Sequence, residues 1–167
     1  LKFIITGGYH SLAISVDNNQ VFAWGSDTYG ELGTGSVTTA AIAPVAVAMT
    51  GALSGKTVVS GDCGVGFTVA LNSEGALASW GFHGLEGCLG DGSPMFNGPP
   101  AKSLVPVQVQ GLGAAKIQSV RCGEKHTLAL TTTGAVFAFG RNWDGQIGDG
   151  TLTNRNQAVP VGLSGDM

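Results

Sequence analysis

The sequence has few charged residues and no strong excess of either sign. Asp, Glu, Lys and Arg make up 11% of its 167 residues, less than half of the usual share of about 25%. The formal net charge is −3, and the eight Lys and Arg residues are scattered along the chain. Nucleic-acid binding requires clustered basic side chains. We therefore expect no direct nucleic-acid interface, although a basic protein surface remains an acceptable partner.

Long apolar runs and a paired set of cysteines are also absent. No uninterrupted apolar run approaches the roughly 18 residues that a membrane-spanning helix needs, so we expect no membrane span. Three cysteines are an odd number, and no pair has the spacing of zinc ligands. Cys63 and Cys122 each precede a glycine and are expected to be buried thiols, whereas Cys88 lies in a glycine loop and is expected to be exposed.

Glycine and apolar residues are what the chain does contain. Gly accounts for 28 residues, and hydrophobic residues for 43%. The apolar content is too high for disorder, and the many short apolar runs between glycines favour β-structure with tight turns. The length is that of one ordinary domain.

Three short motifs each occur three times, in the same order, at intervals of 56 to 59 residues. The first motif is a five-residue apolar arm, at His10–Ile14, Phe67–Leu71 and His126–Leu130. The second motif is an aromatic residue followed by Gly, at Trp24, Trp80 and Phe139. The third motif is a glycine-rich turn, at Gly30–Gly35, Gly87–Gly92 and Gly145–Gly150. Such regularity predicts a tandem repeat with units of about 1–57, 58–116 and 117–167.

Each unit contains the pattern of four short strands. An opening strand leads to a glycine, two apolar arms form a hairpin, and a last strand begins at a proline (Pro44, Pro106 or Pro160). Proline is tolerated on sheet edges, which places this strand outermost. Tandem four-stranded antiparallel units are the blades of a β-propeller. The predicted fold is therefore all-β, a propeller segment with three blades present.

Residue size along the second hairpin arm supports blades packed face to face. A large column holds Trp24, Trp80 and Phe139, and a small column holds Ala23, Ser79 and Ala138. We expect the large column of one blade to meet the small column of the next. His10 and His126 recur at one position of the repeat and are expected to be structural residues.

These motifs resemble the regulator of chromosome condensation repeats. The family pattern contains His-Ser/Thr-x-Ala-Leu, an aromatic–Gly pair and Gly-Gln-Leu-Gly-x-Gly. The third unit matches it with Ile147 in place of Leu, the first departs at Asn19 and Glu31, and the second has Phe67 for His and Cys88 for Gln. The resemblance implies a seven-bladed interaction platform; some members catalyse guanine-nucleotide exchange on a small GTPase and bind chromatin, and others are scaffolds.

Three blades do not complete a ring, because propellers have about four to eight. Two explanations remain open: the chain is a fragment whose remaining blades belong to a longer protein, or a homo-oligomer closes the ring. The start within a strand favours the fragment.

No catalytic, metal or cofactor site is expected. No nucleophile or paired carboxylate recurs beside His10 or His126. The glycine turns lack the Gly-Lys-Ser/Thr ending of a phosphate loop, and Asp91 and Asp149 lack the alternating acidic ligands of a calcium loop. The chain is therefore predicted not to be an enzyme.

Loops that differ among the three copies are the expected binding surface. Their candidate partner-binding residues are Asp27, Tyr29, His83, Glu86, Met95, Phe96, Trp143 and Asp144. The predicted function is a protein–protein interaction scaffold. The alternatives are a guanine-nucleotide exchange module for a small GTPase and a structural or surface protein that assembles through blade–blade contacts.

Overall fold

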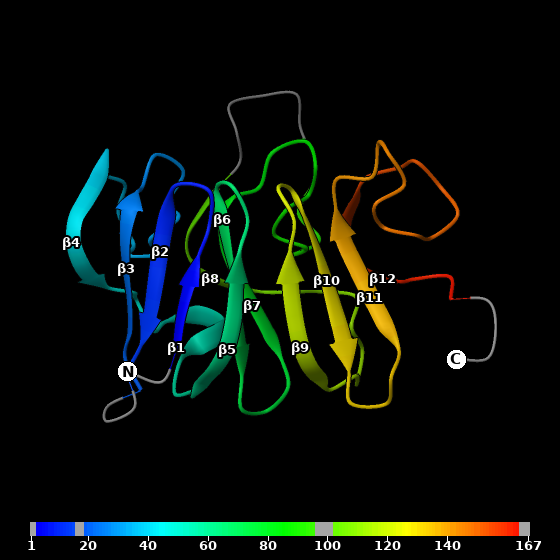
Figure 1. The fold of residues 1–167 in the computed structure, drawn as a ribbon, viewed down its shortest axis with the longest axis horizontal. Coiled ribbons are helices and arrows are strands. Elements are labelled where there is room, and N and C mark those ends of the chain that lie inside the picture. Colours follow the sequence, from blue (N-terminus) through cyan, green and yellow to red (C-terminus); the bar gives the residue numbers. More distant parts are fainter. Residues whose placement is uncertain (1–2, 16–18, 96–101, 164–167) are drawn as a thin grey trace.

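The computed structural model describes residues 3–15, 19–95 and 102–163. Three four-stranded antiparallel sheets follow one another along the chain and lie side by side (Figure 1). The first sheet consists of β1 (Phe3–Thr6), β2 (His10–Ile14), β3 (Val21–Ser26) and β4 (Ala40–Ala46). The second consists of β5 (Val58–Cys63), β6 (Phe67–Asn72), β7 (Leu77–Phe82) and β8 (Lys102–Gln108). The third consists of β9 (Ile117–Cys122), β10 (His126–Thr131), β11 (Val136–Gly140) and β12 (Arg155–Pro160). A short 3₁₀ helix, Gly51–Leu53, separates the first two sheets.

The strands of each sheet pair in chain order, which is the arrangement predicted for a propeller blade. The last strand is outermost, as expected, but it begins at Ala40, Lys102 or Arg155 and not at the proline. On an edge strand the nitrogen of a proline can face solvent, where no neighbouring acceptor loses its donor. A proline inside the last strand is therefore compatible with pairing to the third strand. The described residues form no closed ring.

The aromatic–Gly pair marks an irregularity in every sheet. Pairing of the third strand with the fourth shifts register between Ala23 and Gly25, and at the matching positions of the other sheets. Gly25 has a φ of 104°, and a Cβ there would lie 2.5 Å from the Tyr9 carbonyl oxygen. Only glycine fits this left-handed position against the neighbouring backbone.

Two apolar cores fill the spaces between adjacent sheets. The first core brings Leu12, Ile14 and Ala23 of the first sheet together with Trp80 of the second. The second core brings Val69 and Leu71 together with Phe139 of the third sheet. Trp80 and Phe139 are fully buried, and Ala23 of the small column lies in the same core as Trp80 of the large column.

One end of the molecule carries the turns and loops that vary most. The turns 7–9, 64–66 and 123–125 lie there, together with loops 27–39, 83–95 and 141–154 that follow β3, β7 and β11 (upper edge in Figure 1). We call this the long-loop end. The opposite edge carries the short β6–β7 and β10–β11 connections.

The prediction of an exposed Cys88 is wrong. Cys88 is fully buried, and its Sγ donates to the Lys125 carbonyl oxygen of the next sheet at 3.5 Å. Its turn faces the neighbouring blade and not the solvent, which explains the burial. Cys63 is buried and Cys122 is half-buried, and all three thiols are free.

Candidate functional site

In the first and third blades, the loop at the long-loop end is held by the side chain three residues after the aromatic of the aromatic–Gly pair. In the first blade this residue is Asp27, which is 1% exposed. Its Oδ1 accepts the backbone N–H of Leu32 at 3.2 Å, and its Oδ2 accepts the N–H and the hydroxyl of Thr38 at 2.9 and 3.1 Å. Asp27 therefore fixes the loop from within.

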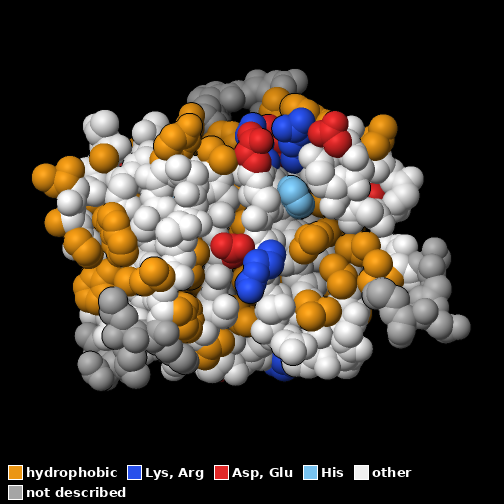
Figure 2. All heavy atoms as spheres, viewed as in Figure 1, with side chains coloured by type: hydrophobic (Ala, Val, Ile, Leu, Met, Phe, Trp, Pro, Cys, Tyr) orange, Lys and Arg blue, Asp and Glu red, His pale blue; other side chains and the backbone are white. Residues whose placement is uncertain are grey.

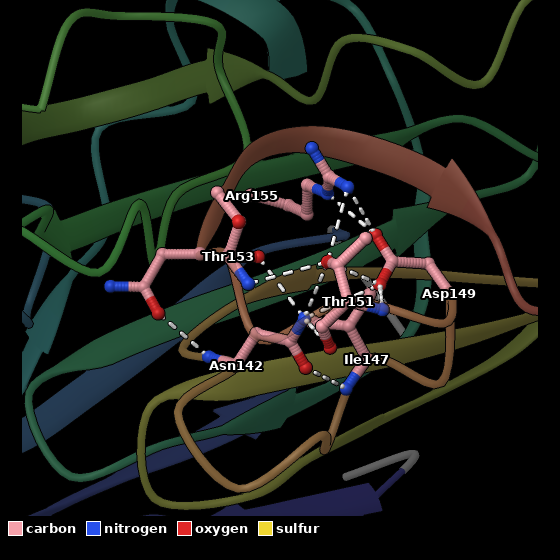
Figure 3. A network of polar contacts seen from close by, with 7 residues as sticks. Asn142, Ile147, Asp149, Thr151, Thr153 and Arg155 are labelled. Atoms are coloured by element: carbon pink, nitrogen blue, oxygen red, sulfur yellow. Dashed lines mark hydrogen bonds and ion pairs between the residues drawn. The ribbon is translucent and has the colours of Figure 1, made fainter.

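The third blade uses Asn142 at the same position (Figure 3). Its Oδ1 accepts the N–H of Ile147 at 2.9 Å, and its Nδ2 donates to the carbonyl oxygens of Thr151 and Thr153 at 3.0 and 3.1 Å. Asp149 accepts the Thr151 hydroxyl at 2.7 Å and Nε–H of Arg155 at 2.6 Å. These two contacts, the hydroxyl first, lower the pKa of Asp149 to about 2. Asn142 and Asp149 together therefore close the loop from within.

The second blade has His83 at this position, which is 1% exposed. Neither ring nitrogen has a hydrogen-bond partner among the described residues, and Nδ1 lies 3.6 Å from Asp91 Oδ1. His83, like Asp27, points into the molecule and offers no surface to a partner.

The remaining candidates differ in their exposure. Tyr29 and Trp143 are exposed by 36% and 54%, and Asp144 is also exposed. The Arg141 guanidinium lies 4.7 Å from the Trp143 ring centroid and 3.2 Å from Asp144 Oδ2. Glu86 is buried and paired with Lys125 at 2.7 Å. Met95 is half-buried, and Phe96 lies outside the described residues.

Two further exposed residues, which the sequence motifs do not identify, lie at the long-loop end. Tyr9 is 72% exposed and Leu85 is 41% exposed. Tyr9 occupies the repeat position of Gly66 and Lys125, so comparison of the three turns would have revealed it as a point of difference. Figure 2 shows charged side chains of both signs gathered at the upper edge of one face, whereas few lie on the rest of that face.

Three blades meet around a hollow of about 150 Å³ at this end. Tyr29 comes from the first blade, Phe82, Phe67 and the Val65–Gly66 turn from the second, and Glu124 and Lys125 from the third. The Tyr29 and Phe82 rings meet edge to face with centroids 5.0 Å apart. Lys125 Nζ lies 5.6 Å from the Phe82 centroid, and its bond to Glu86 raises its pKa.

Of the recurring histidines and aromatics, His10 and Trp80 join the first two blades. His10 Nε2 lies 2.8 Å from Thr68 Oγ1, which donates to the Glu31 carbonyl oxygen at 3.2 Å. The Trp80 indole N–H donates to the same carbonyl at 2.8 Å. Burial lowers the pKa of His10 to about 4, against a smaller opposing effect of Asp27. Desolvation also lowers the pKa of His126, which is half-buried at the outer face of the third blade, and Trp24 is half-buried at the first blade.

The described parts of the chain contain no group of three or more His, Cys, Asp or Glu residues placed to hold a metal ion. Among the same residues, no helix has the length and apolar character needed to cross a membrane.

Comparison with known repeat families decides the relationship. The model of the Regulator of chromosome condensation (RCC1) repeat matches residues 18–71 and 74–130, and a second model of this repeat matches residues 117–146. The chain belongs to the RCC1-repeat family. The resemblance drawn from the three motifs is thereby confirmed.

Relatives with RCC1 repeats include much longer proteins. The human E3 ubiquitin-protein ligase HERC2 is 35% identical over 135 residues, which cover 81% of this chain and 3% of HERC2. The human protein RCC2 is 43% identical over 105 residues, which cover 63% of this chain and 18% of RCC2. The RCC1-repeat chain thus matches only a small part of each.

Solved structures confirm the propeller fold. Human WBSCR16 is 27% identical with a TM-score of 0.81, and the match covers 98% of this chain and 40% of that one. Prp20p from Saccharomyces cerevisiae is 20% identical with a TM-score of 0.83, and the match covers 97% of this chain and 38% of that one.

Proposed function

We propose that this RCC1-repeat chain serves as a protein–protein interaction scaffold and has no catalytic activity of its own. One observation carries the proposal: large exposed side chains (Tyr9, Tyr29, Leu85 and Trp143) gather at the long-loop end. Loops positioned by a rigid framework commonly hold binding residues, and exposed aromatics are enriched where proteins bind one another.

The internal hydrogen bonds of these loops support a preformed surface. Asp27 and Asn142 hold their loops from inside, so little conformational entropy is lost when a partner binds. Trp143 is further held by the Arg141 guanidinium over its ring.

Cross-linking with a photoreactive amino acid tests the scaffold. We expect partners to be captured when it replaces Trp143, at the long-loop end, and not when it replaces Ile42. Ile42 is fully exposed on β4, outside the long-loop end, and serves as the control. Equal capture at both positions, or capture at neither, would contradict the proposal.

Nucleotide exchange on a small GTPase is the first alternative. A solved relative, Prp20p, has been described for its binding to Gsp1p and histones. If the chain is a scaffold, it will not accelerate nucleotide release from a panel of small GTPases. If the wild-type chain accelerates nucleotide release and Trp143→Ala abolishes this effect, the exchange module becomes the better account of the function and the scaffold proposal is wrong.

Assembly through blade faces is the second alternative, and the outer face of the third blade favours it. Leu128 is 38% exposed, whereas the matching Leu12 and Val69 are 1% and 0% exposed because the next blade covers them. A further RCC1-type blade, from a longer chain or a second copy, would cover Leu128 and His126. Sedimentation should show association that Leu128→Glu reduces and Ile42→Glu leaves unchanged; unchanged association in both variants would exclude this face.

A further inference from the structure

The hollow between Tyr29, Phe82 and Lys125 exists only because three blades converge. The backbone N–H of Val65 donates to the Glu124 carbonyl oxygen at 3.0 Å, which fixes the second blade against the third. Gly66 contributes no side chain to the lining, and a Cβ there would project between Phe82 and Tyr29, 3.3 Å from Phe82 Cβ and 3.5 Å from Tyr29 Cδ2. The hollow therefore has walls fixed by three blades, and a methyl group at position 66 would narrow it.

Its size and lining suit one apolar side chain. A cavity of about 150 Å³ with apolar walls accommodates a group as large as benzene, and this hollow has that volume. Tyr29, Val65, Phe67 and Phe82 supply the walls. A leucine or phenylalanine side chain would bury its apolar surface there, at about 25 cal/mol per Å².

The charges around the hollow exclude other occupants. Lys125 Nζ already lies over the Phe82 ring, where a methylated ammonium group would have to sit, so the two aromatic rings do not form a cage for such a group. A small anion would meet the carboxylates of Glu86 and Glu124. A neutral side chain is the occupant that neither charge opposes.

The rim of the hollow nevertheless has a net negative charge. Glu124 and Lys125 are the charged residues that line it. The ammonium of Lys125 is neutralised by Glu86 at 2.7 Å. Glu124 is exposed and forms no ion pair with any described residue. A basic side chain beside the bound apolar group would find its partner there.

We propose that this hollow binds a protein segment in which one leucine- or phenylalanine-like side chain is flanked by Lys or Arg. The proposal rests on the scaffold function and specifies the chemistry of its partner. The apolar side chain enters between Tyr29 and Phe82, and the basic neighbour pairs with the Glu124 carboxylate.

Three substitutions separate the parts of this site. Gly66→Ala narrows the hollow with a methyl group, and the position does not have a left-handed φ, so the backbone tolerates it. Tyr29→Ala removes an exposed wall of the hollow. It tests the same site without relying on Gly66→Ala, should that substitution lower the melting temperature. Glu124→Lys reverses the charge of the rim. Tyr9→Ala, at an exposed tyrosine of the same end that does not line the hollow, is the control.

The test is an NMR titration of the full chain with three synthetic peptides, Gly-Ser-Arg-Leu-Arg-Ser-Gly, Gly-Ser-Glu-Leu-Glu-Ser-Gly and Gly-Ser-Arg-Ser-Arg-Ser-Gly. We expect the basic leucine peptide to shift the amides of Gly66 and Lys125 and to bind at least tenfold more tightly than the other two. Gly66→Ala and Tyr29→Ala should weaken it at least tenfold, and Tyr9→Ala should not. Glu124→Lys should reverse the preference between the two leucine peptides.

The proposal is overturned if the basic leucine peptide causes no shifts, or if Glu124→Lys leaves the preference unchanged. Partner cross-linking at Trp143 that persists alongside such a result would leave the scaffold function standing and remove only this site. Loss of both would remove the scaffold as well.

Discussion

The junction of His10 and Thr68 between the first two blades makes stability depend on pH in a predictable way. Thr68 Oγ1 donates its only hydrogen to the Glu31 carbonyl, so His10 Nε2–H must donate to that oxygen. Nδ1 is buried without a partner among the described residues. Protonation of Nδ1 would bury a charge that no acceptor compensates, which is the physical reason for the lowered pKa.

The perturbation is His10→Phe, which the second blade already contains at this position as Phe67. A glycine packs against the ring in both cases, Gly7 beside His10 and Gly64 beside Phe67, so the larger ring has a precedent in the same chain. At pH 7 we expect the variant to lose about 1 kcal/mol with the hydrogen bond.

Acidification should reverse this order. The folded pKa of about 4 lies below the ordinary histidine pKa of 6.5, so the unfolded chain binds the proton first. The stabilisation is present above pH 6.5 and is lost as the pH falls toward 4. Between pH 7 and 4.5 the linkage relation gives a loss of about 2.4 kcal/mol from His10 alone.

Urea unfolding followed by tryptophan fluorescence measures both chains at both pH values. Because the carboxylates titrate in both proteins, their effect cancels in the difference between the unfolding free energies of wild type and His10→Phe. The variant should be less stable at pH 7 and more stable by about 1.4 kcal/mol at pH 4.5. A difference that changes by less than about 0.5 kcal/mol between the two pH values would refute the assigned burial and hydrogen bond.

Three further predictions concern the blade junctions and loops. Gly33→Ala should lower the free energy of unfolding by about 3 kcal/mol in denaturant titrations, because φ is 63° and the new Cβ would lie 2.7 Å from the Trp80 indole nitrogen. Gly150→Ala is the control: its φ is 80° but the space around it is open, so it should cost only about 1 kcal/mol. Equal costs for the two substitutions would contradict the packing of Gly33 against Trp80. Asn142→Ala should cost about 2 kcal/mol by leaving the buried N–H of Ile147 unpaired, and an unchanged unfolding midpoint would count against the network. Cys88 should resist a thiol reagent until denaturant is added, because burial raises the pKa of its thiol; rapid native labelling would show that the turn opens.

The sequence was sufficient to predict the blades because their determinants are local. The apolar arms, the glycine between them and the aromatic–Gly pair each specify a strand or a turn within a few residues. Gly25 illustrates this, since its left-handed backbone is needed wherever the register shift occurs. Repetition of the three motifs then supplied the architecture.

The exposure of individual loop residues could not be predicted in the same way, because it depends on contacts between blades. Cys88 and Glu31 occupy one position of the glycine-rich turn, and both are buried because the next blade covers them. Asp27 and His83 are candidate partner-binding residues in the sequence but lie inside their loops in the structure. Nothing in their immediate sequence distinguishes a carboxylate that faces solvent from one that binds backbone N–H groups.

The middle blade shares an apolar core with each of its neighbours, whereas the first and third each share one. Every residue of β6 is buried. In a tandem array of this kind, local opening is governed by how many interfaces must be broken. The amides of β6 and β7 should therefore exchange with deuterium most slowly, at the free energy of global unfolding, while the terminal sheets open first. Cooperative unfolding of this chain then depends most on the middle blade, whose motifs depart furthest from the repeat pattern.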